Sequence, residues 1–324
     1  MEIKAIIEEI LKDKKEKGGI KQVYMAACGG SYAALYPTKV FLEKESSELV
    51  SSLYTSNEFV HSQPKALGEN SLVIVCSHKG NTPETIKSAE VAQAKGATVI
   101  ALTWKPDSPI TKHADYVVEY TFGPDKDIAE EKTMQVLTIA VELVNQSEGY
   151  ANYADFVDGK SKIDRIVKLA MKHVEKRADK FAIDHKDDEV VYTMGSGASW
   201  GSAYLQSICI FMEMQWVNSA CIHTGEFFHG PFEITDENIP FMIQISEGST
   251  RELDERALKF LNKYAKRVEV FDAKELGLST IKESVIDYFN HSLFNNVYPV
   301  YNEKLAEVRE HPLHTRRYMW KVEY

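Results

Sequence analysis

A short segment of the chain gathers two hydroxyls, a lysine and a glycine at the end of an apolar run. Residues 76–85 read "CSHKGNTPET", follow "SLVIV" and precede the helical pattern "TIKSAEVAQAKG". A capped helix start would explain the segment, with Asn81 or Thr82 as the N-cap and Pro83 in the first turn. An anion would also fit, because unpaired N–H groups and the positive end of the helix dipole lie at a helix start, where hydroxyls and an ammonium add donors. The segment alone leaves both interpretations open.

A second segment carries a carboxylate and an imidazole in otherwise apolar surroundings. It reads "AYLQSICIFMEMQWVNSACIHTGEFFHGPFEI", and it predicts a helix from about Ala203 to Trp216 that Glu213 interrupts. His229 stands directly before a Gly-Pro pair. A glutamate can lie at a helix edge with its charge in water, and a histidine commonly just satisfies hydrogen bonds. The residues alone leave a structural and a chemical role open for each.

The same segment also suggests a metal site, because His223, Glu226 and His229 follow at intervals of three. Zinc helices of the HExxH kind place their histidines four residues apart, on one face. Histidines six residues apart on a helix would point about 120° apart at 3.6 residues per turn. Gly225 weakens a continuous helix further. We therefore expect no metal and interpret Glu226 as a positioning or surface residue.

Glycine-rich turns follow two of the apolar runs and raise the question of a dinucleotide site. The turn "ACGGSY" lacks the G-x-G-x-x-G spacing, and "GSGASWGS" has glycines at 195, 197 and 201, which puts the third one residue too far. Tight turns that allow close approach of the backbone are the more economical interpretation.

The chain contains one unit twice. The segment "VYMAACGGSYAALY" from Val23 aligns with "VYTMGSGASWGSAY" from Val191, and "LVIVCSHKGNTPET" aligns with "FMIQISEGSTRELD", so that Ser77 meets Ser246. Each copy alternates strands and helices, which predicts an α/β fold with a mostly parallel sheet and helices on both faces. Ligands of such sheets bind beyond the C-terminal ends of the strands, where "CGGS" and "SHKGNT" both lie.

Composition limits the partners of the chain. Its 324 residues carry a formal net charge of −10, which disfavours nucleic acid, because a phosphate backbone needs a basic surface. With 44% hydrophobic residues and a mean hydropathy of −0.30, the chain has the composition of a soluble globular protein. No apolar run reaches the length of a transmembrane candidate, which is about 18 residues. The first residues show no signal-peptide pattern and instead predict an amphipathic helix with one face made by Ile3, Ile6, Ile7, Ile10 and Leu11.

The cysteines indicate a reducing compartment. All four, Cys28, Cys76, Cys209 and Cys221, lie in or beside apolar segments, and no two form a CxxC pair. Reduced cysteine in such places behaves as a small apolar residue. We therefore expect a cytoplasmic protein.

Together these motifs resemble the sugar isomerase, or SIS, family. Two tandem SIS domains are similar to the isomerase half of glucosamine-6-phosphate synthase and its relatives, over nearly the whole chain after the first helix. The resemblance implies that each domain is a flavodoxin-like, three-layer α/β sandwich. We place an N-terminal helix at 1–18, the first SIS domain at 19–150, the second at 151–308, and a tail that contributes to the active site at 309–324.

The resemblance assigns the turn that follows "SLVIV" to a sugar phosphate. The family's Ser-x-Ser-Gly-x-Thr turn carries over to Ser77 and Thr82, whereas Lys79 stands where a second serine is usual and would either supply charge or point away. In the second copy Glu247 and Arg251 occupy corresponding places, and an acid at the positive end of a helix repels phosphate. One phosphate site per chain is therefore expected, in the first copy. Further expected substrate-binding residues are Gly29, Ser31, Gly197 and Ser199.

The resemblance also implies roles for the second segment and the tail. Glu213 would act as the base, with a pKa raised by its apolar helix, and His229, sixteen residues later, would handle the sugar oxygens. The tail "HPLHTRRYMWKVEY" is similar to that of bacterial deglycases that act on 6-phosphorylated fructosamines. Arg316 or Arg317 would meet an amino-acid carboxylate there, and Lys321 is a weaker candidate for the lysine of the synthase.

The predicted activity follows from this resemblance. A deglycase would cleave a 6-phosphorylated fructosamine, such as fructoselysine 6-phosphate, to glucose 6-phosphate and free amino acid through an enolamine and an imine. This chemistry requires no metal and no redox cofactor. Two alternatives stay open: an aldose–ketose phosphosugar isomerase, and a phosphosugar-binding regulator without activity. Family members tend to pair, with the active site at a subunit boundary, so we expect a homodimer that has neither nucleic acid nor membrane as a partner.

Overall fold

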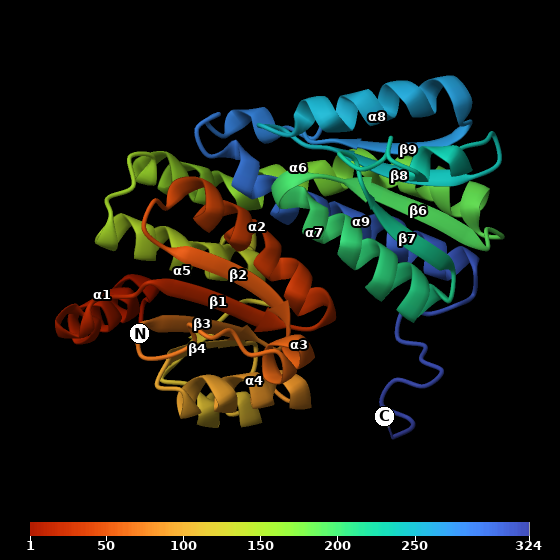
Figure 1. Cartoon of the computed structure of the whole chain (residues 1–324). Helices are drawn as coiled ribbons and strands as arrows, with labels where there is room; N and C mark the ends of the chain where they lie inside the picture. The colour runs from red at the N-terminus through yellow and green to blue at the C-terminus, as the bar shows by residue number, and fades with distance from the viewer. Residues whose placement is uncertain (324) are drawn as a thin grey trace. The chain divides into compact units, whose positions relative to one another are not determined.

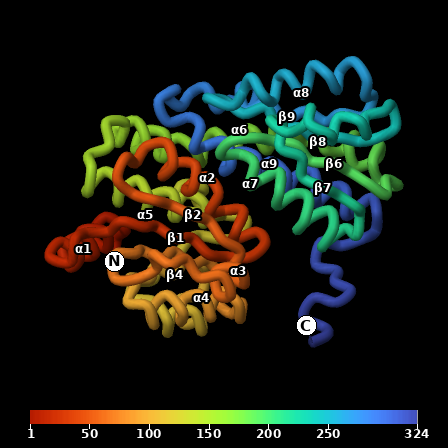
Figure 2. Tube along the Cα trace, in the orientation of Figure 1, coloured from red at the N-terminus to blue at the C-terminus, as the bar shows by residue number. Residues whose placement is uncertain are grey.

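The computed structural model describes residues 1–323 of the chain. Contacts within the chain divide it into two compact units, Met1–Ser161 and the part from Lys162 onwards, and each unit has its own parallel sheet. Figure 1 shows the helices and strands, and Figure 2 follows the Cα trace from the red N-terminal helix to the blue C-terminal tail.

The first unit is a five-stranded parallel sheet covered by helices on both faces. Its strands run in the order β2-β1-β3-β4-β5. Figure 1 shows α3 and α4 on one side of the strands and α2 and α5 on the other. The central strands are buried throughout, because β3 reads "SLVIVC" and β4 "TVIALT", and such unbroken apolar runs suit a sheet covered on both faces. The bounds are β1 Gln22–Ala27, β2 Val50–Thr55, β3 Ser71–Cys76, β4 Thr98–Thr103, β5 Tyr116–Glu119, α1 Ile3–Lys14, α2 Gly29–Glu45, α3 Ser56–His61, α4 Pro83–Ala94 and α5 Lys132–Ser147.

The second unit repeats this topology with four parallel strands in the order β7-β6-β8-β9. Strands β6 and β8 begin at Val190 and Pro240, the places that the alignment of the two copies gives to the first residues of β1 and β3. The predicted repeat is therefore confirmed in the strands themselves. Helix α8 packs its inward face on this sheet through Ala257 and Leu261. The bounds are β6 Val190–Gly195, β7 Asn218–His223, β8 Pro240–Ile245, β9 Arg267–Asp272, α7 Trp200–Leu205, α8 Arg251–Tyr264 and α9 Asn290–Val308. Helix α6, Tyr153–His185, begins in the last residues of the first unit and continues into the second.

Short 3-10 turns complete the two units. They lie at Lys15–Lys17, Pro109–His113, Ile128–Glu130, Gly197–Ser199, Pro231–Ile234, Leu278–Thr280 and Ile286–Phe289. The amphipathic first helix is confirmed, with Ile6, Ile7 and Ile10 buried. None of the four cysteines forms a disulfide. Within residues 1–323, no helix is both long and apolar enough to cross a membrane.

The helix predicted from about Ala203 to Trp216 is corrected by the structure. An α-helix covers only Trp200–Leu205, and Gln206–Gln215 continues it as a π-helix, which ends at Trp216 with φ 56°. The apolar sequence indicates that this segment is helical. It does not distinguish the backbone hydrogen bonds of an α-helix, which join residues four apart, from those of a π-helix, which join residues five apart. Long π-helices are rare and occur frequently at functional sites.

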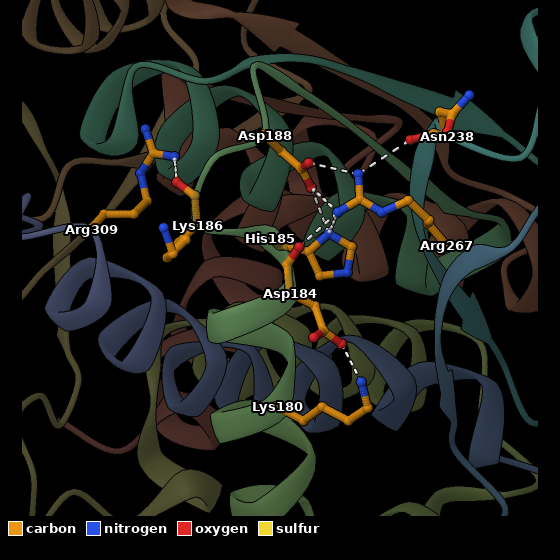
Figure 3. A network of polar contacts seen from close by, with 8 residues as sticks. All are labelled: Lys180, Asp184, His185, Lys186, Asp188, Asn238, Arg267 and Arg309. Carbon is orange, nitrogen blue, oxygen red and sulfur yellow. Dashed lines mark hydrogen bonds and ion pairs between the residues drawn. The ribbon is translucent and has the colours of Figure 1, made fainter.

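A polar network fixes the amino end of β9 in the second unit (Figure 3). Arg267 donates to both carboxylate oxygens of Asp188, at 2.6 and 2.9 Å, and to the carbonyl oxygen of Asp184 at 2.8 Å. His185 Nδ1 lies 2.6 Å from Asp188. These contacts tie the end of α6 to the sheet at the edge opposite the C-terminal strand ends, so we interpret the network as structural.

Candidate active site

The turn between β3 and α4 brings the two expected phosphate hydroxyls together. Ser77 Oγ lies 2.9 Å from Thr82 Oγ1, and Ser77 is buried while Thr82 is partly exposed. Of the two N-cap positions that the sequence leaves open, the structure has Thr82 as the N-cap of α4, and Pro83 is the first residue of the helix. The Thr82 hydroxyl makes no capping bond to the helix and faces Ser77 instead. Two hydroxyls and a helix start therefore converge at one point.

Gly80 gives this turn its shape. Its φ is 64°, and a Cβ added there would lie 1.8 Å from Ser108 Oγ. The Gly80 carbonyl oxygen accepts a bond of 2.9 Å from the amide of Ile110. A side chain at this position would push the turn away from residues 108–110, so the glycine is required by both conformation and space.

The glycine-rich turn after β1 lies at a neighbouring strand end. Strands β1 and β3 are paired in parallel, and Ala27 lies opposite Cys76, so the turns that follow them leave the sheet at the same edge. Gly29 begins α2 with φ 53°, and Ser31 in the same turn accepts a hydrogen bond of 3.3 Å from Lys132 Nζ. Ser31 and Ser77 therefore follow adjacent strand ends.

His78 lies within the phosphate turn, and its surroundings were not expected from the sequence. Its ring stacks on Trp104 with a centroid distance of 5.5 Å and an interplanar angle of 8°, and its Nδ1 lies 2.9 Å from the Tyr120 hydroxyl. Burial, followed by the charges of Lys132 and Lys79, lowers the pKa of His78 to about 4. His78 is therefore neutral near pH 7. Lys79 itself is exposed.

In the second unit, Glu213 forms an ion pair with the C-terminal tail. Its Oε1 lies 2.7 Å from Arg316 Nη2, and the two side chains are only 20% and 10% exposed. Burial raises the pKa of Glu213, whereas the charge of Arg316 and its hydrogen bond act in the opposite direction. A half-buried carboxylate with a raised pKa fits a general base.

The Arg316 guanidinium is held in place but is not fully bonded. Its Nη1 donates to the carbonyl oxygens of Leu313 and Thr315, both at 2.8 Å. Its Nε is buried and makes no hydrogen bond within residues 1–323. On the side of the guanidinium formed by Nε and Nη2, Nη2 therefore donates to Glu213 and Nε has no acceptor. A planar carboxylate can bind this side of an arginine with two parallel hydrogen bonds.

Other tail residues pack around the end of the π-helix. The Arg317 guanidinium lies 4.3 Å from the centroid of the Trp216 ring, and Gln215 Nε2 donates to the His311 carbonyl oxygen at 2.8 Å. Lys321 Nζ donates to the carbonyl oxygen of Arg316 at 2.5 Å. Lys321 thus braces the backbone of Arg316.

His229 lies in an exposed turn after β7. Its backbone amide donates to the carbonyl oxygen of Glu226 at 2.9 Å, and both side chains are exposed. Within residues 1–323, the ion-pair partner of Glu213 is Arg316, and no hydrogen bond joins His229 to Glu213. In the same range, no three His, Cys, Asp or Glu side chains are grouped so that they could hold a metal ion.

Asp254 fills the strand-end site of the second copy. This fully buried carboxylate accepts from Ser196 Oγ at 2.6 Å, from Thr224 Oγ1 at 2.7 Å, and from the amide and hydroxyl of Ser246 at 2.9 and 2.5 Å. Burial raises its pKa while these bonds lower it. Because its partners follow β6, β7 and β8, Asp254 ties three strand ends together. The sequence offered a signal, since Asp254 shares one face of α8 with Ala257 and Leu261.

The remaining expected residues of the second copy are engaged within the fold. Ser199 is fully buried and donates to the carbonyl oxygen of Ser196 at 2.8 Å. Gly197 has φ 53°, and a Cβ there would lie 2.6 Å from Thr250 Oγ1. Arg251, at the place of Thr82, bonds Asp272 at 2.7 Å. The donors of this turn therefore bond to other groups of the second unit, whereas the hydroxyls of Ser77 and Thr82 in the first copy bond to each other.

Two parallel sheets flanked by helices define an α/β protein, and comparison with known proteins gives its family. The SIS domain family matches residues 19–144. Fructosamine deglycase FrlB of Bacillus subtilis (strain 168) is 45% identical over 319 residues, which are 98% of this chain and 97% of the relative. Fructoselysine 6-phosphate deglycase of Escherichia coli (strain K12) is 26% identical over 275 residues, 85% of this chain and 78% of the relative.

A solved structure agrees over the full length. The crystal structure of a protein from Salmonella typhimurium LT2, provisionally named a phosphosugar isomerase, has a TM-score of 0.95 and 45% identity, and covers 100% of this chain and 98% of its own. The chain belongs to the SIS domain family. Among its relatives, the fructosamine deglycase of Bacillus subtilis shares nearly its whole length.

Proposed function

We propose that the protein is a deglycase that cleaves a 6-phosphorylated fructosamine to glucose 6-phosphate and a free amino acid. The observation that carries this proposal is the half-buried Glu213 carboxylate, 2.7 Å from an Arg316 guanidinium that has a further donor free. A base and a carboxylate-binding group lie side by side, as a substrate made of a sugar and an amino acid requires. The 45% identity to a fructosamine deglycase supports the same reaction.

The proposed reaction moves one proton between two carbons before water enters. Glu213 takes the proton from C1 of the open-chain ketosamine, and the electrons form an enolamine between C1 and C2. Protonation at C2 gives an aldose imine, and water then adds at C1 and releases the amine. His229 delivers a proton to the ring oxygen when the cyclic substrate opens. General acid–base groups of this kind contribute about 10²–10⁴-fold each.

Arg316 is the proposed partner of the substrate's carboxylate, and Arg317 is the second candidate. A carboxylate on the Nε–Nη2 edge of Arg316 would form two charge-assisted bonds in place of the one bond to Glu213. Binding of the substrate would then free the Glu213 carboxylate next to the carbon from which it takes the proton.

Ser77 and Thr82 are the proposed phosphate hydroxyls, with Gly29 and Ser31 at the adjacent strand end. Lys79 is kept as a phosphate-binding candidate, although its exposure gives it weaker support than the paired hydroxyls have. Gly197 and Ser199 have the least support as substrate-binding residues, because the hydroxyl of Ser199 is already bonded within the fold.

We further propose a cytoplasmic homodimer whose active site lies near the subunit boundary. Four cysteines that form no disulfide support a reducing compartment. Light scattering on the purified chain tests the dimer, since a mass near 36.7 kDa would be that of a monomer.

Release of free amine tests the activity itself. The purified protein is incubated with fructoselysine 6-phosphate, and lysine and glucose 6-phosphate are quantified together. Equal amounts of both are expected. Interconversion of fructose 6-phosphate and glucose 6-phosphate without amine release would instead identify an aldose–ketose isomerase, and binding without turnover would identify a regulator.

A further inference from the structure

We infer that Lys132, the first residue of α5, supplies the cation that binds the substrate's phosphate in the first unit. This inference rests on the proposed function, because it names a further group of the same phosphate site. Neither the Ser77–Thr82 turn nor the comparisons point to this lysine.

The position of Lys132 links it to the phosphate turn. Its Nζ lies 3.3 Å from Ser31 Oγ, and Ser31 belongs to the turn that leaves the sheet beside Ser77. The same ammonium lies 5.5 Å from the centroid of the Tyr120 ring, whose hydroxyl is bonded to His78. The ammonium therefore contacts the turn after β1 directly, and it lies over the ring that is bonded to His78 in the turn after β3.

The charge of Lys132 has no counter-ion within residues 1–323. The two acids that precede it in the chain bind other lysines: Glu131 lies 3.0 Å from Lys126, and Glu130 lies 3.2 Å from Lys160. Lys132 itself is half-buried and donates only to a neutral hydroxyl. Partial burial of an uncompensated cation is unfavourable, and it is especially notable in a chain of net charge −10. An anionic ligand at this place would offset that cost.

Neighbouring groups do not replace this charge. The pKa of His78 is lowered to about 4 by burial and by the charges of Lys132 and Lys79, so the imidazole is neutral near pH 7. Lys79 is exposed, where water screens its charge. Burial raises the pKa of the Cys76 thiol, and the positive charge of Lys132 partly offsets this rise. Because Cys76 is the last residue of β3, the charge of Lys132 acts at the end of that strand.

A purely structural role would use Lys132 only as a cation above the Tyr120 ring. A structural role and a phosphate-binding role predict different effects when a substitution removes the charge of Lys132. A structural lysine would change stability and leave phosphate affinity intact in the folded fraction. A phosphate-binding lysine would change affinity for phosphorylated ligands alone.

The test compares Lys132→Met with Lys95→Met, which removes the same charge from an exposed position at the far end of α4. Binding of glucose 6-phosphate and of glucose is measured by calorimetry. We expect Lys132→Met to weaken glucose 6-phosphate binding tenfold or more, Lys95→Met to stay within twofold, and Lys132→Arg to restore binding to within about threefold. Should Lys132→Met fail to fold, Lys132→Gln is measured by the same criterion.

Two outcomes would overturn the inference: a folded Lys132→Met or Lys132→Gln protein that binds glucose 6-phosphate within twofold of wild type, or a wild-type protein that binds it no better than glucose. Neither measurement requires turnover. Failure of the deglycase proposal would appear separately, as binding of glucose 6-phosphate by a protein that releases no amine from fructoselysine 6-phosphate.

Discussion

The Arg316 guanidinium lies 2.7 Å from the Glu213 carboxylate. The C-terminal tail therefore contacts the π-helix at Glu213, the acidic residue of that helix. Burial and Arg316 act on this carboxylate in opposite directions: burial raises its pKa, and the positive charge lowers it. The tail therefore holds the pKa of Glu213 below the value that burial alone would give it in the free protein.

Removing the charge of Arg316 should move the pH dependence of the reaction. Arg316→Gln deletes the positive charge that lowers the pKa of Glu213, while burial still raises it, so the carboxylate stays protonated to higher pH. The acid limb of kcat/KM should shift to higher pH, because this limb reports the free enzyme's base. Arg317→Gln, which removes a guanidinium stacked on Trp216, should leave the limb in place. An unmoved limb in Arg316→Gln would show that another group titrates there.

The paired hydroxyls of the phosphate turn should act on KM. Replacing both Ser77 and Thr82 by Ala should raise KM for fructoselysine 6-phosphate tenfold or more and change kcat little, because a hydrogen bond to a charged group contributes about 1.5–3 kcal/mol. Steady-state kinetics with the phosphorylated substrate measures the effect. Equal turnover of the unphosphorylated fructosamine by wild type would rule out the phosphate site.

Much of the fold could be predicted from the sequence because it depends on local patterns. The two copies, their parallel sheets and the helix start at Thr82 follow from periodicity and turn chemistry. The contact of Arg316 with Glu213 depends on how the tail folds back, and no local pattern encodes it. The π-helix was missed for a different reason, since an apolar run has no feature that selects its hydrogen-bond spacing.

The buried carboxylate of Asp254 should dominate the stability of the second unit. Asp254→Ala leaves the buried donors of Ser196, Thr224 and Ser246 without their shared acceptor, at a cost of about 1–3 kcal/mol for each unsatisfied group. Urea denaturation should show a loss of about 3 kcal/mol or more in the free energy of unfolding. Glu252→Ala, at an exposed position of the same helix, should change it by about 0.5 kcal/mol or less. Similar losses in both variants would contradict this role.

His78 should make the first unit acid-sensitive. Its pKa is about 4 in the folded chain against an ordinary value of 6.5, so the unfolded chain binds the proton first as pH falls. The neutral His78 therefore stabilises the folded chain fully above pH 6.5, and this contribution to the free energy of unfolding is lost as the pH falls from 6.5 to about 4. His78→Gln should therefore show a shallower fall over this range in denaturation curves. Parallel curves for the two proteins would mean that His78 titrates normally in the folded state.

The turnover of Glu213→Gln tests the central claim most directly. Glutamine keeps the size and much of the hydrogen-bonding reach of the side chain but cannot take a proton from C1. The variant should fold and bind glucose 6-phosphate like wild type, while kcat for release of lysine from fructoselysine 6-phosphate falls by about 10²-fold or more. A folded Glu213→Gln protein that binds the sugar phosphate and releases lysine within about threefold of the wild-type rate would contradict the assignment of Glu213 as the base.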